Sequence, residues 1–117
     1  LQSFGFKHGS PPDADFVFDS RCLPNPHWQT ALRAMTGKDA PVVEYLGGNA
    51  MVARYETQVL GFLQEWLPVF EAENRSYLTI AIGCTGGQHR SVYLVERLAK
   101  RLESGHIAVS VRHRELP

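Results

Sequence analysis

The chain has 117 residues, of which 44% are hydrophobic and 21% charged, and its formal net charge is zero. This length and apolar content suit one globular domain with one core, so we predict a single domain over residues 1–117. No run of 18 or more apolar residues is present, and the first residues lack the pattern of a signal peptide. We therefore expect a cytoplasmic protein that does not cross a membrane, with Cys22 and Cys84 reduced.

Apolar residues that alternate or run continuously predict strands, and apolar residues three or four apart predict helices. In chain order we predict strands at 3–7 and 15–19, a short helix at 27–37, a long helix from 49 to about 70, a strand at 78–82, a helix at 92–104 and a strand at 107–111. Residues 42–46 fit a strand or a helical turn. We expect Pro68 to kink the long helix or to end it early.

The strand at residues 78–82 is continuously apolar, which is typical of a strand covered on both faces, so we place it centrally in the sheet. With the helix and strand that follow, it forms a βαβ unit, which implies a right-handed crossover and a parallel pair. We therefore predict an α/β fold: a single three-layer domain with a mostly parallel sheet and a strand–anion-binding loop–helix unit.

The connection at residues 83–91 (GCTGGQHRS) carries the chemistry of this unit. Glycines at 86 and 87 allow backbone amides to converge at a helix N-terminus, where an anion is favoured. We expect Arg90, on an exposed loop, to bind a phosphate in bidentate fashion, with hydroxyl donors from Thr85 and Ser91. The sequence therefore predicts a site for a small phosphorylated ligand or another anion. The alternative is a plain glycine-containing turn.

Two other motifs were compared with this loop. The Walker loop needs a lysine and Ser/Thr after its closing glycine, and that sequence is absent here. The spacing of Cys84, Arg90 and Ser91 resembles the signature of cysteine-dependent phosphatases, in which the thiolate attacks phosphorus and the arginine holds oxygens. Gly83 stands where that family usually has a histidine, and no general-acid loop can be named, although Asp13, Asp15, Asp19 or His27 could fold over the site.

A second polar cluster follows the first two predicted strands. Asp19, Arg21 and His27 lie at a strand end and on a proline-rich loop, where a carboxylate and an imidazole suit sugar hydroxyl or amino groups. His8 is better explained as a surface residue. Irregular spacing disfavours a zinc site formed by the histidines and cysteines, and we predict neither a metal nor a cofactor.

The last part of the chain, residues 84–117, carries six basic and three acidic side chains. Such an excess suits either a solvated surface or contact with nucleic acid. The residues that we predict to contact RNA backbone phosphates are Arg97, Lys100, Arg101, Arg112 and Arg114.

Several motifs together resemble the C-terminal domain of the RapZ/YvcJ family, the bacterial RNase adapter proteins. They are SFGFKHG at 3–9, FDSRCLPNP at 18–26, RSYLTIAIGCTGGQHRSVY at 75–93 and HR at 113–114, and they span nearly the whole chain. Members of this family also carry an N-terminal P-loop domain that binds ATP or GTP, which is absent from this chain. The resemblance implies an oligomer in the full-length protein.

The resemblance implies a binding role. The family's C-terminal domain senses glucosamine-6-phosphate, and in enteric bacteria it binds small regulatory RNAs and presents one of them to RNase E. Matched by motif, the ligand-binding residues are Asp19, Arg21, His27, Cys84, Thr85, Gly86, Gly87, His89 and Arg90. We expect a non-enzymatic sensor domain; the alternatives are a cysteine-dependent phosphatase that uses Cys84 and Arg90, or an RNA-binding or oligomerisation module without a metabolite.

Overall fold

The computed structural model describes residues 1–75 and 77–117. In chain order its main elements are β1 (Gln2–Gly5), β2 (Phe16–Asp19), α1 (Ala40–Gly47), α2 (Ala50–Ala72), β3 (Ile80–Cys84), α3 (Arg90–Ser104) and β4 (Arg112–His113). Short 3-10 turns occupy the connections: η1 (Phe6–His8), η2 (Pro26–Trp28) and η3 (Thr30–Leu32).

The strands of the described residues form a four-stranded sheet in the order β2-β3-β1-β4, in which all pairs are parallel. The predicted α/β fold with a parallel sheet is therefore confirmed. β3 lies between β2 and β1 and is buried along its whole length, as its continuous apolar sequence predicted. The crossover through α3 leads to β4, which pairs with β1 and not with β3.

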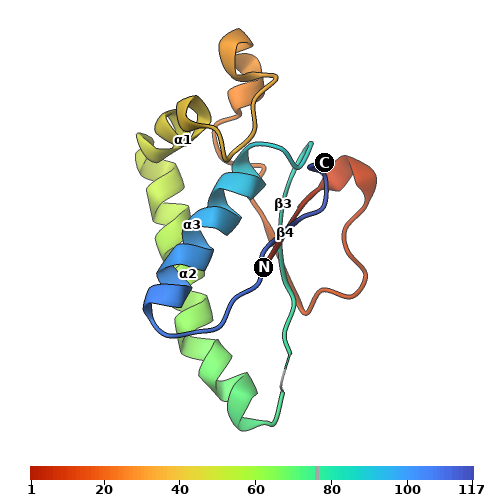
Figure 1. Cartoon of the computed structure of the whole chain (residues 1–117), viewed down its shortest axis with the longest axis vertical. Coiled ribbons are helices and arrows are strands. Elements are labelled where there is room, and N and C mark those ends of the chain that lie inside the picture. Colours follow the sequence, from red (N-terminus) through yellow and green to blue (C-terminus); the bar gives the residue numbers. More distant parts are fainter. Residues whose placement is uncertain (76) are drawn as a thin grey trace.

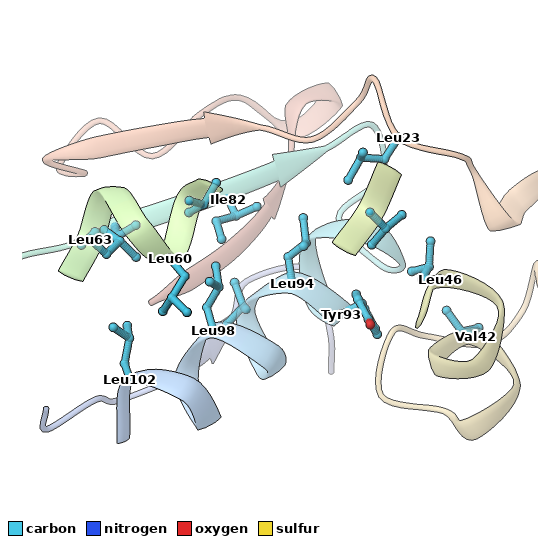
Figure 2. Packing of buried hydrophobic residues seen from close by; sticks show 14 residues of the cluster. Leu23, Val42, Leu46, Leu60, Leu63, Ile82, Tyr93, Leu94, Leu98 and Leu102 are labelled. Atoms are coloured by element: carbon cyan, nitrogen blue, oxygen red, sulfur yellow. The ribbon is translucent and has the colours of Figure 1, made fainter. Parts of the chain in front are cut away.

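The α-helices cover one face of the sheet, where Ile80 and Ile82 of β3 join the hydrophobic core (Figures 1 and 2). Successive strand residues point to opposite faces, so Gly83 and its register partner Phe4 face the other way. On that side Phe6 of η1 packs edge-on against Phe4, with ring centroids 4.8 Å apart. The third layer is thus formed by η1 and connecting segments.

Local sequence explains most helix positions. Asn49 accepts hydrogen bonds from the N–H groups of Met51 and Val52, so it caps α2 as its residue type predicts. The helix continues past Pro68 to Ala72, so the predicted early end is wrong. Residues 42–46 lie within α1, which decides between the two predicted states.

Two other predictions are wrong. The segment 107–111 was predicted as a strand, but the pairing residues are Arg112 and His113. Ile107 and Val109 pack against the core without a partner strand, so their alternation reflects burial alone. In place of the short helix predicted at 27–37, the structure has the two 3-10 turns η2 and η3, and residues 33–37 are irregular.

Candidate functional site

A cavity of about 510 Å³ lies beside the loop that joins β3 to α3. Its walls come from three separate parts of the sequence: η1, the stretch around η2, and the loop with the start of α3. The lining residues are Lys7, Asn25, His27, Trp28, Arg33, Cys84, Thr85, Gly86, Gln88, His89 and Arg90. Open parallel sheets bind ligands at the carboxyl ends of their strands, and this volume is within the range of small-molecule sites.

A larger cavity of about 670 Å³ lies near the amino ends of β1 and β3, between the last turns of α2 and residues 106–110. It contains none of the predicted ligand-binding residues. We assign the functional site to the smaller cavity, because the glycine-rich loop and the first turn of a long helix meet there.

Four residues of the loop at residues 85–89 line this cavity: Thr85, Gly86, Gln88 and His89. Within the described part of the chain, none of the backbone amides of residues 85–89 donates to a protein acceptor, although the carbonyls of Thr85, Gln88 and His89 accept hydrogen bonds. Thr85 accepts from the Lys7 N–H at 3.2 Å, and Gln88 accepts from the Gly37 N–H at 2.8 Å. Fixed carbonyls and free amides beside a helix N-terminus favour an anion.

The two loop glycines have different roles, although the sequence predicted that both bind ligand. Gly87 has a φ of +75°, and a Cβ there would lie 2.5 Å from the backbone N of Gly5 and 2.7 Å from the carbonyl C of Phe4. Gly87 therefore allows the loop to pack on β1, and it does not line the cavity. Gly86 does line it, and a Cβ there would meet only the end of the Lys7 side chain, at 4.0 Å.

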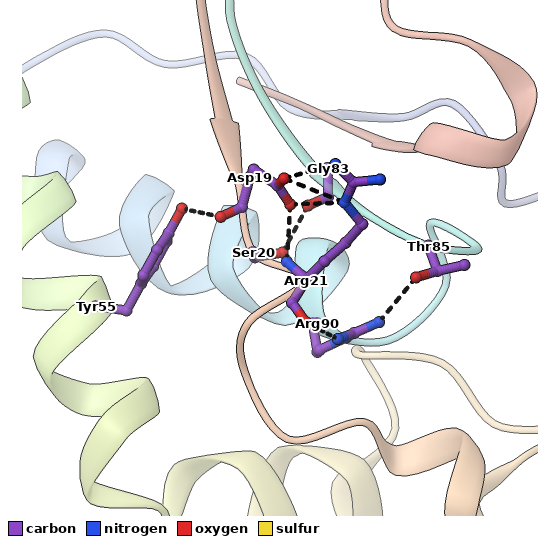
Figure 3. Close-up of polar contacts among 7 residues, drawn as sticks. All are labelled: Asp19, Ser20, Arg21, Tyr55, Gly83, Thr85 and Arg90. Atoms are coloured by element: carbon purple, nitrogen blue, oxygen red, sulfur yellow. Dashed lines mark hydrogen bonds and ion pairs between the residues drawn. The ribbon is translucent and has the colours of Figure 1, made fainter.

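Arg90 lies at the start of α3 and is only 4% exposed, so its predicted place on an exposed loop is wrong. Its Nη1 donates to the carbonyl oxygen of Arg21 at 2.9 Å, and its Nη2 approaches Thr85 Oγ1 at 3.4 Å (Figure 3). Nη1 also donates to the carbonyl oxygen of Leu23 at 3.0 Å. Its buried Nε has no partner among the described residues. One guanidinium group thus connects the loop to the segment after β2 and keeps an unused donor.

His89 also lines the cavity and is buried, and its Nε2 has no hydrogen-bond partner in the described structure. Burial lowers the pKa of His89 from its ordinary value of 6.5, and the nearby backbone carbonyls of Met35, Leu32 and Arg33 only partly oppose this effect. None of those carbonyls accepts a hydrogen bond from Nε2. The imidazole is therefore neutral at pH 7. In the neutral form one ring nitrogen carries the proton and the other is an acceptor, and Nε2 has no protein partner for either role.

Cys84 lies at the end of β3, lines the cavity and is almost fully buried. Its Sγ lies 3.1 Å from Ser91 Oγ and accepts from the Ser91 N–H at 3.5 Å. Both cysteines are free thiols, with Cys22 exposed. The Cys84 and Ser91 pair therefore forms the base of the loop.

Asp19 and Arg21 lie at the same edge of the sheet but do not line the cavity. They form an exposed ion pair with 2.7 Å between Oδ2 and Nη2, and the guanidinium stacks 3.9 Å from the centre of the Phe6 ring. The hydrogen bond from Arg21 holds the pKa of Asp19 below its ordinary value. The Tyr55 hydroxyl donates to the Asp19 carbonyl at 2.6 Å (Figure 3), and burial raises the pKa of Tyr55 to about 12.

The predicted ligand-binding set left out five residues that line the cavity: Lys7, Asn25, Trp28, Arg33 and Gln88. Asn25 and Trp28 lie on the same proline-rich loop as His27, which the sequence had indicated for a sugar, and Gln88 lies within the loop predicted to bind an anion. Lys7 follows the carboxyl end of β1, so the rule that selected the loop after β3 would also have selected it. Arg33 gave no such signal, because it reaches the cavity through a pair of 3-10 turns that the sequence did not predict.

The five basic residues predicted to contact RNA do not form one surface. Arg97 and Arg101 both pair with the buried carboxylate of Glu56, at 3.3 and 2.8 Å, while Lys100 on the same helix is exposed. By register, Arg112 and Arg114 point away from the helix-covered face. Arg114 also forms an ion pair with Glu115 at 2.8 Å.

A buried chain of Ser3, His113 and Glu96 has the residue types of a hydrolytic triad. Ser3 Oγ lies 2.7 Å from His113 Nδ1, and His113 Nε2 lies 2.7 Å from Glu96 Oε2. Ser3 is wholly buried, however, and none of the three residues lines either cavity. The chain therefore attaches β4 to α3 and has no access to a substrate.

Neither a membrane-spanning helix nor a metal-binding cluster is present among the described residues. None of the helices in residues 1–75 and 77–117 is both long and apolar enough to span a bilayer. No group of three or more His, Cys, Asp or Glu side chains within the same residues is arranged to hold a metal ion.

The whole chain, residues 1–117, matches the family described as the RapZ C-terminal domain. A nucleotide-binding protein of Methylococcus capsulatus is 64% identical over 117 residues, which are 100% of this chain and 40% of that protein. Proteins of the same description from Alkalilimnicola ehrlichii and from a Shewanella species are 62% and 60% identical over 116 residues, covering 99% of this chain and 40% and 41% of theirs. The chain thus spans about two fifths of the length of the curated relatives it matches.

Proposed function

Because this chain belongs to the family of RapZ C-terminal domains, we propose that its cavity binds a sugar phosphate and that the domain is a non-enzymatic sensor. Glucosamine-6-phosphate, which the family resemblance implies, is the first candidate ligand. One observation supports the proposal: Thr85, Gly86, Gln88 and His89, whose backbone amides donate to no acceptor among the described residues, line one cavity together with the buried cation of Arg90. These donors match the oxygens of a phosphate.

The charge of the cavity supports this ligand class. Lys7, Arg33 and Arg90 supply positive charge, and no carboxylate is among the residues that line the cavity. A phosphate at the loop leaves room toward Asn25 and Gln88, whose amides suit hydroxyl groups. Asp19, which the family resemblance implies as a ligand-binding residue, lies at the same sheet edge but outside the cavity lining, and it is paired with Arg21. It would have to leave that ion pair to recognise the ammonium group of an amino sugar.

A thermal-shift comparison tests the proposal, because a ligand that binds only the native state raises the melting temperature. We expect glucosamine-6-phosphate and inorganic phosphate to raise it and unphosphorylated glucosamine to leave it unchanged. Asp19→Asn is the matched variant: it should reduce any preference for glucosamine-6-phosphate over glucose-6-phosphate and leave inorganic phosphate binding intact. A melting temperature that no phosphate compound changes would contradict the proposal.

We further propose that ligand occupancy is coupled to a small regulatory RNA and to an RNase partner, as the family resemblance implies. The same cationic cavity suits an RNA backbone phosphate, so we expect competition with the sugar phosphate. Linkage then requires that RNA lowers sugar-phosphate affinity by the factor by which the ligand lowers RNA affinity. If a saturating concentration of the sugar phosphate left the RNA affinity unchanged, the proposed coupling would be contradicted.

The printed names of the relatives describe them as nucleotide-binding proteins. Since this chain matches about two fifths of their length, we assign that activity to the N-terminal P-loop domain that the resemblance implies. We therefore expect no ATP or GTP binding by this chain alone, which equilibrium dialysis would check.

Cysteine-dependent phosphatase is the second candidate, and the contacts of Cys84 Sγ with Ser91 favour it. A hydroxyl at 3.1 Å and an N–H at 3.5 Å are donors that would stabilise a thiolate. Against it, Arg90 bonds to the carbonyls of Arg21 and Leu23, and no carboxylic acid lines the cavity. Hydrolysis of an activated aryl phosphate that disappears in Cys84→Ser would establish the enzyme; we expect none in the parent.

A further inference from the structure

We propose that Trp28 forms a stacking platform for the sugar ring of the ligand, against which the ring's C–H face packs while its phosphate is held at residues 85–89. This inference rests on the proposed function and adds the recognition of the ring. It also names a determinant of specificity that the family resemblance did not identify.

The first observation is the position of Trp28. It lines the cavity and yet is 74% exposed, which is unusual for so large an apolar side chain. The ring of His27 meets it edge-on, with centroids 5.6 Å apart and planes at 81°, so most of the indole surface stays open. An open aromatic surface in a polar cavity is available for a ligand.

The second observation is that the backbone around Trp28 is held rigidly. Pro26 is buried at the start of η2, and Asn25 Oδ1 caps the turn by accepting from the His27 N–H at 3.1 Å. The Trp28 N–H donates to the Asn25 carbonyl at 3.2 Å, and Arg33 Nε donates to the His27 carbonyl at 3.0 Å. Because this backbone is fixed, only the torsions of the Trp28 side chain itself remain to be ordered on binding.

The chemistry of the cavity indicates a sugar ring as the occupant. A phosphate at the loop fills only part of about 510 Å³, so the rest of the ligand must occupy the space toward Trp28. That space combines one aromatic surface with the amides of Asn25 and Gln88. A sugar has the matching parts, since its C–H groups suit the indole and its hydroxyls suit the amides.

The test compares glucosamine-6-phosphate with inorganic phosphate by isothermal titration of the whole chain and its Trp28→Ala and Trp28→Phe variants. Because an aromatic contact contributes about 0.5 to 1.5 kcal/mol, Trp28→Ala should weaken glucosamine-6-phosphate binding about 2- to 13-fold. Inorganic phosphate should bind the parent and both variants equally. Trp28→Phe should retain most of the sugar-phosphate affinity.

Fluorescence gives an independent readout. In a Trp66→Phe background, in which Trp28 is the one remaining tryptophan, glucosamine-6-phosphate should change the emission and inorganic phosphate should not. Trp66 lies on α2 outside both cavities, so its replacement leaves the site intact.

Three results would overturn the inference. Equal weakening of phosphate and sugar phosphate in Trp28→Ala would mean that Trp28 supports the loop and not the ring. Unchanged sugar-phosphate binding in that variant would mean that Trp28 does not contact the sugar ring. If only the binding of a nucleoside monophosphate were weakened in Trp28→Ala, Trp28 would stack on a nucleobase and not on a sugar. Failure of the parent to bind any phosphate compound would instead refute the proposed function, and the inference with it.

Discussion

The two ends of α3 each carry arginines, but these side chains have opposite environments. At the N-terminal end, Arg90 is 4% exposed, bonds only to neutral oxygens and keeps its Nε free. Toward the C-terminal end, Arg97 and Arg101 are about half exposed and share the buried carboxylate of Glu56. A buried cation without a counter-ion remains available to an anionic ligand, whereas a neutralised pair is part of the framework.

Substitution of a loop glycine should produce the largest effect on stability, and it tests how the loop before the N-terminal end of α3 is held in place. Gly87→Ala puts a Cβ against the backbone of β1 at a positive φ, so we expect a loss of about 2 to 4 kcal/mol of unfolding free energy. Gly86→Ala is the matched control and should unfold near the parent, because its Cβ has room. Chemical denaturation checks both, and equal stability of the two variants would contradict the assigned roles.

Arg90→Ala should reduce phosphate affinity roughly 10-fold or more, because a charge-assisted contact is lost. It should also destabilise the fold by about 2 kcal/mol, since the carbonyls of Arg21 and Leu23 lose their donor. Arg97→Ala removes the same charge from the same helix and should leave phosphate affinity unchanged. Titration calorimetry would measure the phosphate affinity of both variants, and thermal melts would measure their stability. Equal phosphate affinity in Arg90→Ala and Arg97→Ala would contradict the different roles assigned to the two arginines.

Glu56→Gln tests the other end of the helix. Removing the buried charge weakens two ion pairs, but the half-exposed arginines can return to water, so we expect a loss of about 1 to 2 kcal/mol. Glu103→Gln, at an exposed position of α3, should change stability little. Denaturation midpoints would show the difference, and phosphate affinity should stay constant in both variants.

The smallest effect concerns pH. Burial lowers the pKa of His89 in the folded state, so between that pKa and 6.5 the unfolded chain binds more protons. The stability from keeping His89 neutral is present above pH 6.5 and is lost as the pH falls through that window. We expect His89→Gln to flatten the decline in melting temperature below pH 6.5 relative to the parent, and an unchanged decline would contradict this role of His89.

The sequence predicted the parallel sheet, the long helices and the glycine-rich loop between β3 and α3, because each depends on a local pattern. The apolar run of β3 and the spacing along α2 directly reflect burial, and Asn49 is a strong capping residue. The prediction of a strand at 107–111 was wrong because an alternating pattern indicates which side chains are buried. It does not indicate whether the backbone pairs with another strand. The 3-10 turns at η2 and η3 carried no periodic signal.

The site was predicted only in part for a similar reason. The predicted set contained most of the loop and also His27, but it left out Lys7 and Arg33, which reach the cavity through tertiary packing. Arg97 and Arg101 pair with Glu56, whereas Arg90 bonds to carbonyls that follow β2. All of these partners lie far from α3 in the sequence. No pattern in the helix itself distinguishes the three arginines.

The central claim is that an anion binds to the free amides of residues 85–89. Titration of isotope-labelled protein with inorganic phosphate, followed through backbone amide resonances, tests it most directly. The account predicts that the signals of residues 85–89 and of the first turn of α3 shift and saturate together, while those of Arg97 to Arg101 stay in place. Shifts centred on Arg97 to Arg101, or none at saturating phosphate, would contradict it.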